Sequence, residues 1–208
     1  MCIRDRVNEI ELEGRKDFRD LFTVTIDGRD SKDFDDAISI EKNGENYDLY
    51  VHIADVAHYV KKGTAIDKDA YERGNSTYLF NIVIPMLPEV LSNGICSLNP
   101  NEDRLAISLR MTINDKGKVI DNEFYESVIN SDHRLVYDDV NSFLDKGDED
   151  VYEDELIKEK LKIFDELREI LNTMREKRGS IDFNFSESQI DVGEDGSCLL
   201  YTSPSPRD

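Results

Sequence analysis

The sequence has few of the residues that characterise several common classes of protein. Its three cysteines, Cys2, Cys96 and Cys198, have no metal-ligand spacing and do not suggest a disulfide framework. No apolar run approaches the roughly 20 residues that span a membrane, and the N-terminal part lacks the apolar core of a secretory signal. These absences predict a cytoplasmic protein with no membrane partner, in which Cys96 is a small buried residue.

Basic residues are also scarce, because 26 lysines and arginines stand against 46 aspartates and glutamates, for a net charge of −20. Phosphate contacts usually need a basic surface, so this charge argues against tight nucleic-acid binding by the chain alone. Much of the acid lies in one segment, 148–155, which predicts a solvated helix start rather than a binding surface. The charge therefore does not argue against a local binding channel.

The two ends of the chain are related at the level of DNA. The string ATGTGTATAAGAGACAG encodes residues 1–5 and leads into Arg6, and its reverse complement encodes residues 198–202. Inverted copies at both ends resemble a sequencing adapter that was translated together with an insert. We therefore expect residues 1–6 and 197–208 to be adapter-derived and exclude them from fold reasoning.

The pattern of apolar residues predicts an α+β fold with a mixed, largely antiparallel sheet and flanking helices. Apolar and alternating runs predict strands at 22–26, 37–40, 47–54, 104–113, 119–129 and 181–185. The strands at 104–113 and 119–129 are expected to form a hairpin across the turn 114–117. Thr64 is a predicted cap for a helix that runs to Arg73 and stops at Gly74. Further helices are expected at 137–144 and 151–178, the second with a continuous apolar stripe.

The most informative stretch is DGRDSKDFDD, residues 27–36, which holds five carboxylates directly after the apolar run 22–26. Like charges this close repel one another unless positive charge lies among them. Hard divalent cations prefer carboxylate oxygens and, in pairs, support phosphoryl chemistry, so the stretch predicts either a metal site or a solvated acidic turn. An EF-hand counted from Asp27 fails, because Lys32 and Ile38 stand where glycine and glutamate are needed.

Several blocks, in order along the chain, resemble the catalytic domain of the ribonuclease II and ribonuclease R family. They are DGRDSKDFDDAI, LYVHIADVAHYV, RGNSTYLF and VIPMLPEVLSNGICSLNPNEDR, and the ICSLNP and KRGSIDF blocks favour ribonuclease R-like members. The resemblance covers about 17–191. It implies a processive, metal-dependent 3′→5′ exoribonuclease that binds the 3′ end of single-stranded RNA, not DNA, and releases nucleoside 5′-monophosphates.

The resemblance also implies a domain organisation. Residues 7–20 correspond to the linker from an upstream RNA-binding barrel, and residues 21–196 to the N-terminal part of a truncated catalytic domain. In the family an arginine-bearing segment near the active site follows later in the chain. We therefore expect little activity from this chain by itself, because positive charge opposite the metals would be missing.

Active-site roles follow from the resemblance residue by residue. Asp27, Asp33 and Asp36 match aspartates that ligate Mg²⁺ or Mn²⁺, and Asp35 matches the aspartate most directly tied to catalysis. Asp35 could orient or deprotonate the attacking water. Asp30 is an extra carboxylate and is expected to be a surface residue.

Four further residues are candidates for substrate binding, each with a competing structural interpretation. Tyr78 matches an aromatic residue that stacks on a base near the RNA 3′ end, or it is a core residue. Tyr137 matches a tyrosine near the RNA path, or it packs on the sheet. Asn99 and Arg104 flank a loop in which Arg104 binds a phosphate or forms a surface salt bridge.

Two other functions fit the sequence less well, and two histidines receive no catalytic role. A non-catalytic RNA-binding homologue is disfavoured because all four family aspartates are present. A metal-dependent phosphatase with an aspartyl nucleophile needs an Asp-x-Asp opening, and Arg29 occupies its third position. His52 and His58 lack ligand partners at zinc spacing, so both are expected to be structural.

Overall fold

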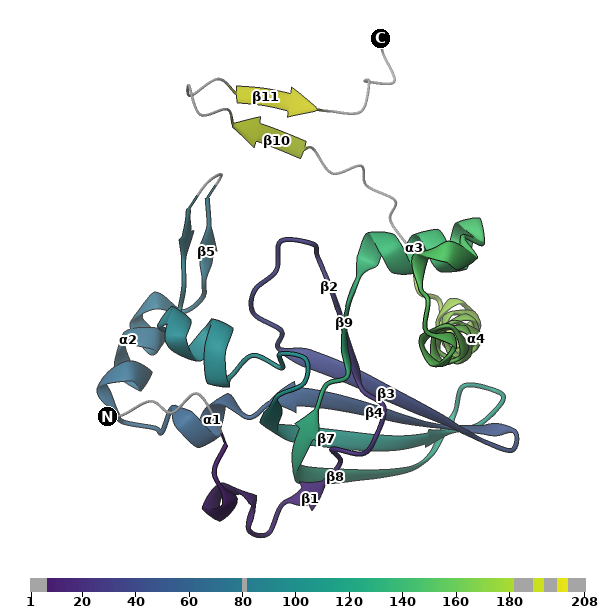
Figure 1. Ribbon diagram of the computed structural model, residues 1–208, viewed down its shortest axis with the longest axis horizontal. Coiled ribbons are helices and arrows are strands. Elements are labelled where there is room, and N and C mark those ends of the chain that lie inside the picture. Colours follow the sequence, from purple (N-terminus) through teal and green to yellow (C-terminus); the bar gives the residue numbers. More distant parts are fainter. Residues whose placement is uncertain (1–6, 80–81, 182–188, 193–197, 202–208) are drawn as a thin grey trace.

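One mixed sheet of seven strands is the framework of the computed structural model (Figure 1). The structure describes residues 7–79, 82–181, 189–192 and 198–201. The strands lie in the order β1-β8-β7-β4-β3-β2-β9, and only the pairings of β1 with β8 and β2 with β9 are parallel. The predicted α+β fold with a mixed, largely antiparallel sheet is confirmed. The strands of this sheet are β1 (Lys16–Asp17), β2 (Val24–Asp27), β3 (Asp36–Asn43), β4 (Asn46–Ala54), β7 (Asp103–Ile113), β8 (Val119–Asn130) and β9 (His133–Val136).

Turn chemistry explains why the longest strand pair forms where it does. Asn114 Oδ1 accepts hydrogen bonds from the backbone amides of Lys116 and Lys118, and Gly117 has a φ of +74° that a β-branched residue would resist. The turn joins β7 to β8, which confirms the predicted hairpin.

Helix α2 begins and ends at the residues that the sequence predicts, and α4 is somewhat shorter than the helix predicted at 151–178. The Thr64 hydroxyl accepts a hydrogen bond from the Asp67 amide at the start of α2, and Gly74 ends this helix. Asp154 caps α4 in the same way through the Leu156 amide. The helical segments are η1 (Glu9–Leu12), α1 (Val56–Tyr59), α2 (Ala65–Arg73), the π-helical η2 (Val90–Ile95), α3 (Tyr137–Lys146), η3 (Glu149–Val151) and α4 (Glu155–Lys177). No helix in the described part of the chain is long and apolar enough to cross a membrane.

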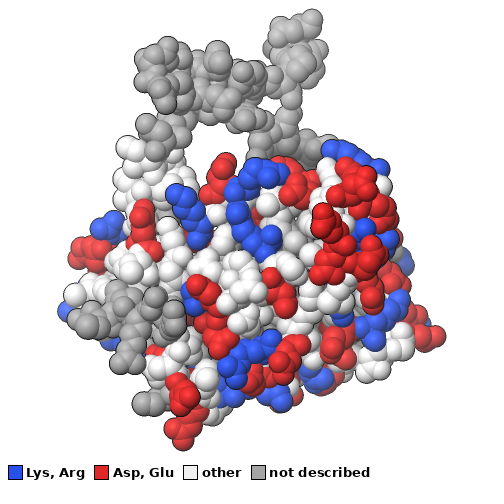
Figure 2. All heavy atoms as spheres, in the orientation of Figure 1, with Lys and Arg blue, Asp and Glu red and all other residues white. Residues whose placement is uncertain are grey.

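Helices α3 and α4 lie together against β2, β9 and the β3–β4 end of the sheet (Figure 1). The stripe predicted for α4 faces this core, where Ile157, Leu161 and Leu167 are buried. Acidic side chains gather on the outside of this pair of helices, on the right of Figure 2. Their outward position agrees with a solvated helix start.

A row of hydroxyl groups crosses the sheet through a buried histidine. His52 Nε2 lies 3.1 Å from Ser39 Oγ, and His52 Nδ1 lies 2.6 Å from Ser108 Oγ. The row continues to Thr23 on one side and to Ser127 on the other. Burial lowers the pKa of His52 to about 4, so the imidazole is neutral. The structural role expected of His52 is confirmed.

The remaining segments lie outside the large sheet or at its edge. Segment 7–20 contributes η1 and the edge strand β1, and the Phe18 ring packs against Tyr50 and Tyr125. Two small antiparallel pairs are formed by β5 (Thr77–Tyr78) with β6 (Val83–Ile84), and by β10 (Gln189–Val192) with β11 (Cys198–Tyr201). Most of the strand predicted at 181–185, and residues 1–6, 197 and 202–208, lie outside the described residues.

Candidate active site

Two neighbouring strands bring the acidic stretch to one end of the sheet. Asp27 is the last residue of β2 and Asp36 is the first residue of β3, and these strands pair antiparallel. Asp33 and Asp35 lie on the connection between them. Residues 27–36 are termed the acidic loop below. Because both of its ends are fixed in the sheet, the loop presents its carboxylates over one short stretch of the sheet edge.

The carboxylates in the acidic loop destabilise one another's charged forms. Burial is the largest cause that raises the pKa of Asp27, and the charge of Asp36 adds to it, while Arg134 lowers it. Partial desolvation also raises the pKa of Asp35, followed by the charges of Asp33 and Asp36. Raised carboxylate pKa values of this origin are typical of clustered acids without a compensating cation.

The carboxylates of the acidic loop are the kind of ligand that a hard divalent cation prefers, but they do not lie close enough together to coordinate one. Asp27 Oδ2 is buried and has no hydrogen-bond partner among the described residues. Such an oxygen is costly unless a cation or a donor lies near it. Within the described ranges, no three His, Cys, Asp or Glu side chains are close enough together to hold a metal ion. Ligation of Mg²⁺ or Mn²⁺ would therefore require the carboxylates to move closer to one another.

Ser97 and its neighbour hold the second half of the acidic loop. The Phe34 amide donates to Ser97 Oγ at 2.9 Å, and the Leu98 amide donates to the Phe34 carbonyl at 2.8 Å. The Phe34 ring is buried beneath the loop in a cluster that includes Ala37 and Ala106. Phe34 therefore anchors the loop by packing, while the aspartates on either side of it stay outside the core.

Arg134, which the sequence analysis did not single out, holds the first half of the loop. Its Nη2 lies 3.0 Å from the Gly28 carbonyl oxygen, 2.6 Å from that of Arg29 and 3.3 Å from that of Ser31. Its guanidinium carbon lies 5.1 Å from the centre of the Phe34 ring. The signal that could have found it is the arginine directly before the apolar residues Leu135 and Val136 in the four-residue strand β9.

Tyr78 lies beside the acidic loop and is not a core residue. Its side chain is 67% exposed, and the negative charge of Asp33 raises its pKa, with desolvation and Asp35 contributing less. A cavity of about 1060 Å³ is lined by residues 28–33 of the acidic loop and by Tyr78, Val83 and Ser92. The structure therefore places Tyr78 with Asp33 at the wall of an open cavity, whereas Asp27, Asp35 and Asp36 are not among its lining residues.

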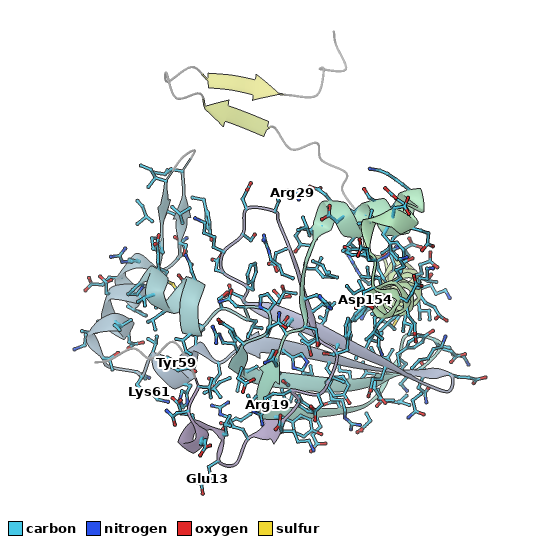
Figure 3. The ribbon with its side chains drawn as sticks, in the orientation of Figure 1. Glu13, Arg19, Arg29, Tyr59, Lys61 and Asp154 are labelled. Carbon is cyan, nitrogen blue, oxygen red and sulfur yellow. The ribbon has the colours of Figure 1, made fainter. Side chains whose placement is uncertain are left out.

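Tyr137 begins α3 directly after β9 and is 56% exposed, so it does not pack on the sheet. It is not among the residues that line the cavity beside Tyr78. The start of α3 nevertheless contacts the acidic loop, because Asp139 forms an ion pair of 3.0 Å with Arg29. Figure 3 labels Arg29 near the tip of this loop, next to α3.

Asn99 and Arg104 line a different cavity, of about 840 Å³, on the other side of η2. Arg104 is buried, and it donates to the Ser97 carbonyl at 2.8 Å and the Asp103 carbonyl at 3.0 Å, with a further contact to Glu102. The Arg104 guanidinium thus supports the backbone that carries Ser97. Phosphate binding by Asn99 and Arg104 stays a prediction, and the position of the acidic loop does not depend on it.

Two expected structural residues lie near the site without joining it. Cys96 is buried, and desolvation raises the pKa of its thiol to about 11, so it is an unreactive thiol. His58 Nε2 lies 3.1 Å from Glu11, and its backbone amide donates to Asp55, which forms a buried ion pair with Arg15. These contacts fix segment 7–20 to α1.

Comparisons with known proteins agree with this arrangement. The RNB domain family matches residues 15–205. Ribonuclease R of Thermotoga maritima is 51% identical over 201 residues, and ribonuclease R of Mycoplasmopsis pulmonis is 48% identical over 203 residues. Each alignment covers 95% of this chain, but only 28% and 27% of those proteins. The structure of Mycoplasma genitalium RNase R in complex with double-stranded RNA superimposes with a TM-score of 0.87 and 37% identity, over 93% of this chain and 35% of that one.

The chain therefore belongs to the RNB domain family. The curated relatives named above are ribonuclease R proteins, as the ICSLNP and KRGSIDF blocks predict. The chain spans less than a third of the length of the two curated relatives named above.

Proposed function

We propose that this chain carries the active site of a metal-dependent, processive 3′→5′ exoribonuclease that hydrolyses single-stranded RNA to nucleoside 5′-monophosphates. The observation that carries the proposal is the acidic loop, in which four aspartates with the family's spacing share one end of the sheet beside the exposed ring of Tyr78. The similarity to ribonuclease R proteins supports the reaction type. Structures of Mycoplasma genitalium RNase R in complex with double-stranded RNA and with ribose methylated single-stranded RNA support RNA as the class of substrate.

Each residue of the loop would have a separate task. Asp27, Asp33 and Asp36 would hold Mg²⁺ or Mn²⁺, which, when bound, lowers the pKa of a coordinated water and stabilises the leaving oxygen. Asp35 would orient the attacking water and accept its proton. Tyr78 would stack on the base next to the scissile phosphate.

A non-catalytic RNA-binding homologue is the second candidate. One observation favours it, since no three acidic side chains in the described part of the chain converge as metal ligands. Asp27 Oδ2, which has no hydrogen-bond partner among the residues that the structure describes, favours the enzyme instead, because a buried carboxylate oxygen without a partner is costly unless a cation binds to it.

A chimera tests the reaction type. Residues 15–196 of this chain, the family-matched range without the end expected to be adapter-derived, would replace the matching segment of Thermotoga maritima ribonuclease R, which supplies the parts of the protein that this chain does not span. We expect release of nucleoside 5′-monophosphates from RNA in Mg²⁺. We expect no release with EDTA, or with DNA of the same sequence, which lacks the 2′ hydroxyl. A folded chimera that binds RNA but releases nothing would favour the non-catalytic homologue.

A further inference from the structure

The acidic loop does not determine its own conformation. Between β2 and β3 the only backbone hydrogen bond formed within the described loop runs from the Ser31 amide to the Gly28 carbonyl, at 3.1 Å. Five aspartates in ten residues repel one another. The shape of the loop must therefore come from contacts with other parts of the chain.

Arg134 supplies these contacts for residues 28–31. Three backbone carbonyl oxygens, those of Gly28, Arg29 and Ser31, lie within 2.6–3.3 Å of its Nη2. Carbonyl oxygens that converge on one charged donor form stronger hydrogen bonds than neutral pairs do. The guanidinium also covers the Phe34 ring, so a single side chain contacts both halves of the loop.

Strand pairing brings Arg134 to this position. Strand β9 pairs parallel with β2, with Arg134 opposite Thr25 and Val136 opposite Asp27. The strand that carries Arg134 therefore runs beside the strand that ends at the first aspartate of the loop. Arg134 Nε is buried without a hydrogen-bond partner among the described residues, so the side chain is held chiefly by the carbonyls that Nη2 contacts.

We propose that Arg134 is a positioning residue, which orders the backbone of the acidic loop so that Asp27 and Asp33 can ligate one divalent cation. The metal half of this statement rests on the proposed function. The ordering half does not, because it concerns the loop without any metal.

Electrostatics and positioning predict opposite results for the loss of Arg134. Removing a positive charge near a cation site should tighten cation binding if charge alone matters. Removing a positioning contact should weaken it, and outer-shell partners of metal sites are worth about 10–100-fold in affinity. The sign of the change in Mn²⁺ affinity therefore separates the two roles.

The experiment uses this chain with Arg134→Gln, and with Arg29→Gln as the matched control. Arg29 also carries one positive charge in the loop, but its ion pair with Asp139 is solvent-exposed and worth little. Mn²⁺ binding is measured by electron paramagnetic resonance. Hydrogen exchange of the Ser31 and Phe34 amides is measured without metal, because both are hydrogen-bonded within or against the loop. Arg134→Met, which keeps the apolar stem over Phe34, replaces Arg134→Gln if the latter does not fold.

We expect Arg134→Gln to weaken Mn²⁺ binding about tenfold or more and to speed hydrogen exchange of the Ser31 and Phe34 amides. The exchange of amides in β7 and β8 should not change. Arg29→Gln should have Mn²⁺ affinity and exchange rates close to those of the unmodified chain. Unchanged exchange at Ser31 and Phe34 overturns the proposal, as does Mn²⁺ binding that is unchanged or tighter, or an equal effect of Arg29→Gln. If Mn²⁺ binding by the unmodified chain is insensitive to both Asp27→Asn and Asp33→Asn, the proposed metal function fails. Exchange at Ser31 and Phe34 then decides by itself whether Arg134 orders the loop.

Discussion

At the residue scale, the exposed ring of Tyr78 beside Asp33 is the clearest candidate contact for RNA. In the chimera we expect Tyr78→Ala to change the length of the short RNA at which digestion stops. Tyr78→Phe should be mild, because stacking needs the ring and not the hydroxyl. The end products are resolved on a sequencing gel.

Tyr71→Ala is the matched control for Tyr78, since Tyr71 on α2 is 88% exposed and does not line the cavity. We expect its end product to be that of the unmodified chimera. A Tyr78→Ala variant with a normal end product and a normal melting temperature would refute the stacking role.

The aspartates of the loop could be predicted from sequence because their chemistry is local, five carboxylates in ten residues after an apolar run. Arg134 and Ser97 could not, because their importance comes from backbone atoms about a hundred and about sixty residues away that they contact only after folding. The burial of Arg104 was missed for the same reason, since its partners are carbonyl groups with no sequence signature.

At the element scale, the hydroxyl row through His52 joins β3, β4, β7 and β8. Its histidine should make stability depend on pH, because burial lowers the pKa of His52 from 6.5 to about 4. The unfolded chain takes up a proton below about pH 6.5 while the folded chain stays neutral. The stabilisation is therefore complete above pH 6.5 and is lost as the pH falls toward 4, by about 3 kcal/mol in all.

Urea unfolding of this chain at pH 7.5 and pH 4.5 checks the effect of His52. We expect His52→Gln to lower the free energy of unfolding at pH 7.5, and to reduce its fall between the two pH values. The raised pKa values of Asp27 and Asp35 act in the opposite direction, and the comparison with the unmodified chain cancels them. His133→Gln, at a partly exposed side chain, is the control. An unchanged pH dependence in His52→Gln would contradict the account.

Elements with local signals were predicted well. Thr64 and Gly74 bound α2, and the Asn114–Gly117 turn joins β7 to β8, because caps and turns are set by neighbouring residues. The order of strands in the sheet was not predicted. The placement of β9 beside β2, which brings Arg134 to the acidic loop, depends on packing between segments far apart in the sequence.

At the scale of the whole molecule, the net charge of −20 argues against tight RNA binding by the chain alone. We expect the chain by itself to bind divalent metal weakly, to release little or no nucleoside monophosphate from RNA, and to be prone to aggregation. The apolar side chains exposed on β6 and the sheet, such as Val83, Ile84 and Phe124, support the last expectation. Light scattering and incubation with Mg²⁺ and labelled RNA test these expectations. Robust release of monophosphates that Asp35→Asn abolishes would show that they are wrong.

The central claim is that the acidic loop performs the hydrolysis, and single-turnover cleavage of RNA by the chimera tests it most directly. Asp35→Asn removes the base but keeps the size of the side chain, so cleavage should slow by about two to four orders of magnitude. RNA affinity should change little, because most of it comes from phosphate contacts elsewhere. Asp30→Asn, the same change at the exposed extra carboxylate of the loop, should leave the rate within about twofold of the unmodified chimera. A near-normal cleavage rate in a folded Asp35→Asn chimera, or an equal loss in Asp30→Asn, would contradict the account.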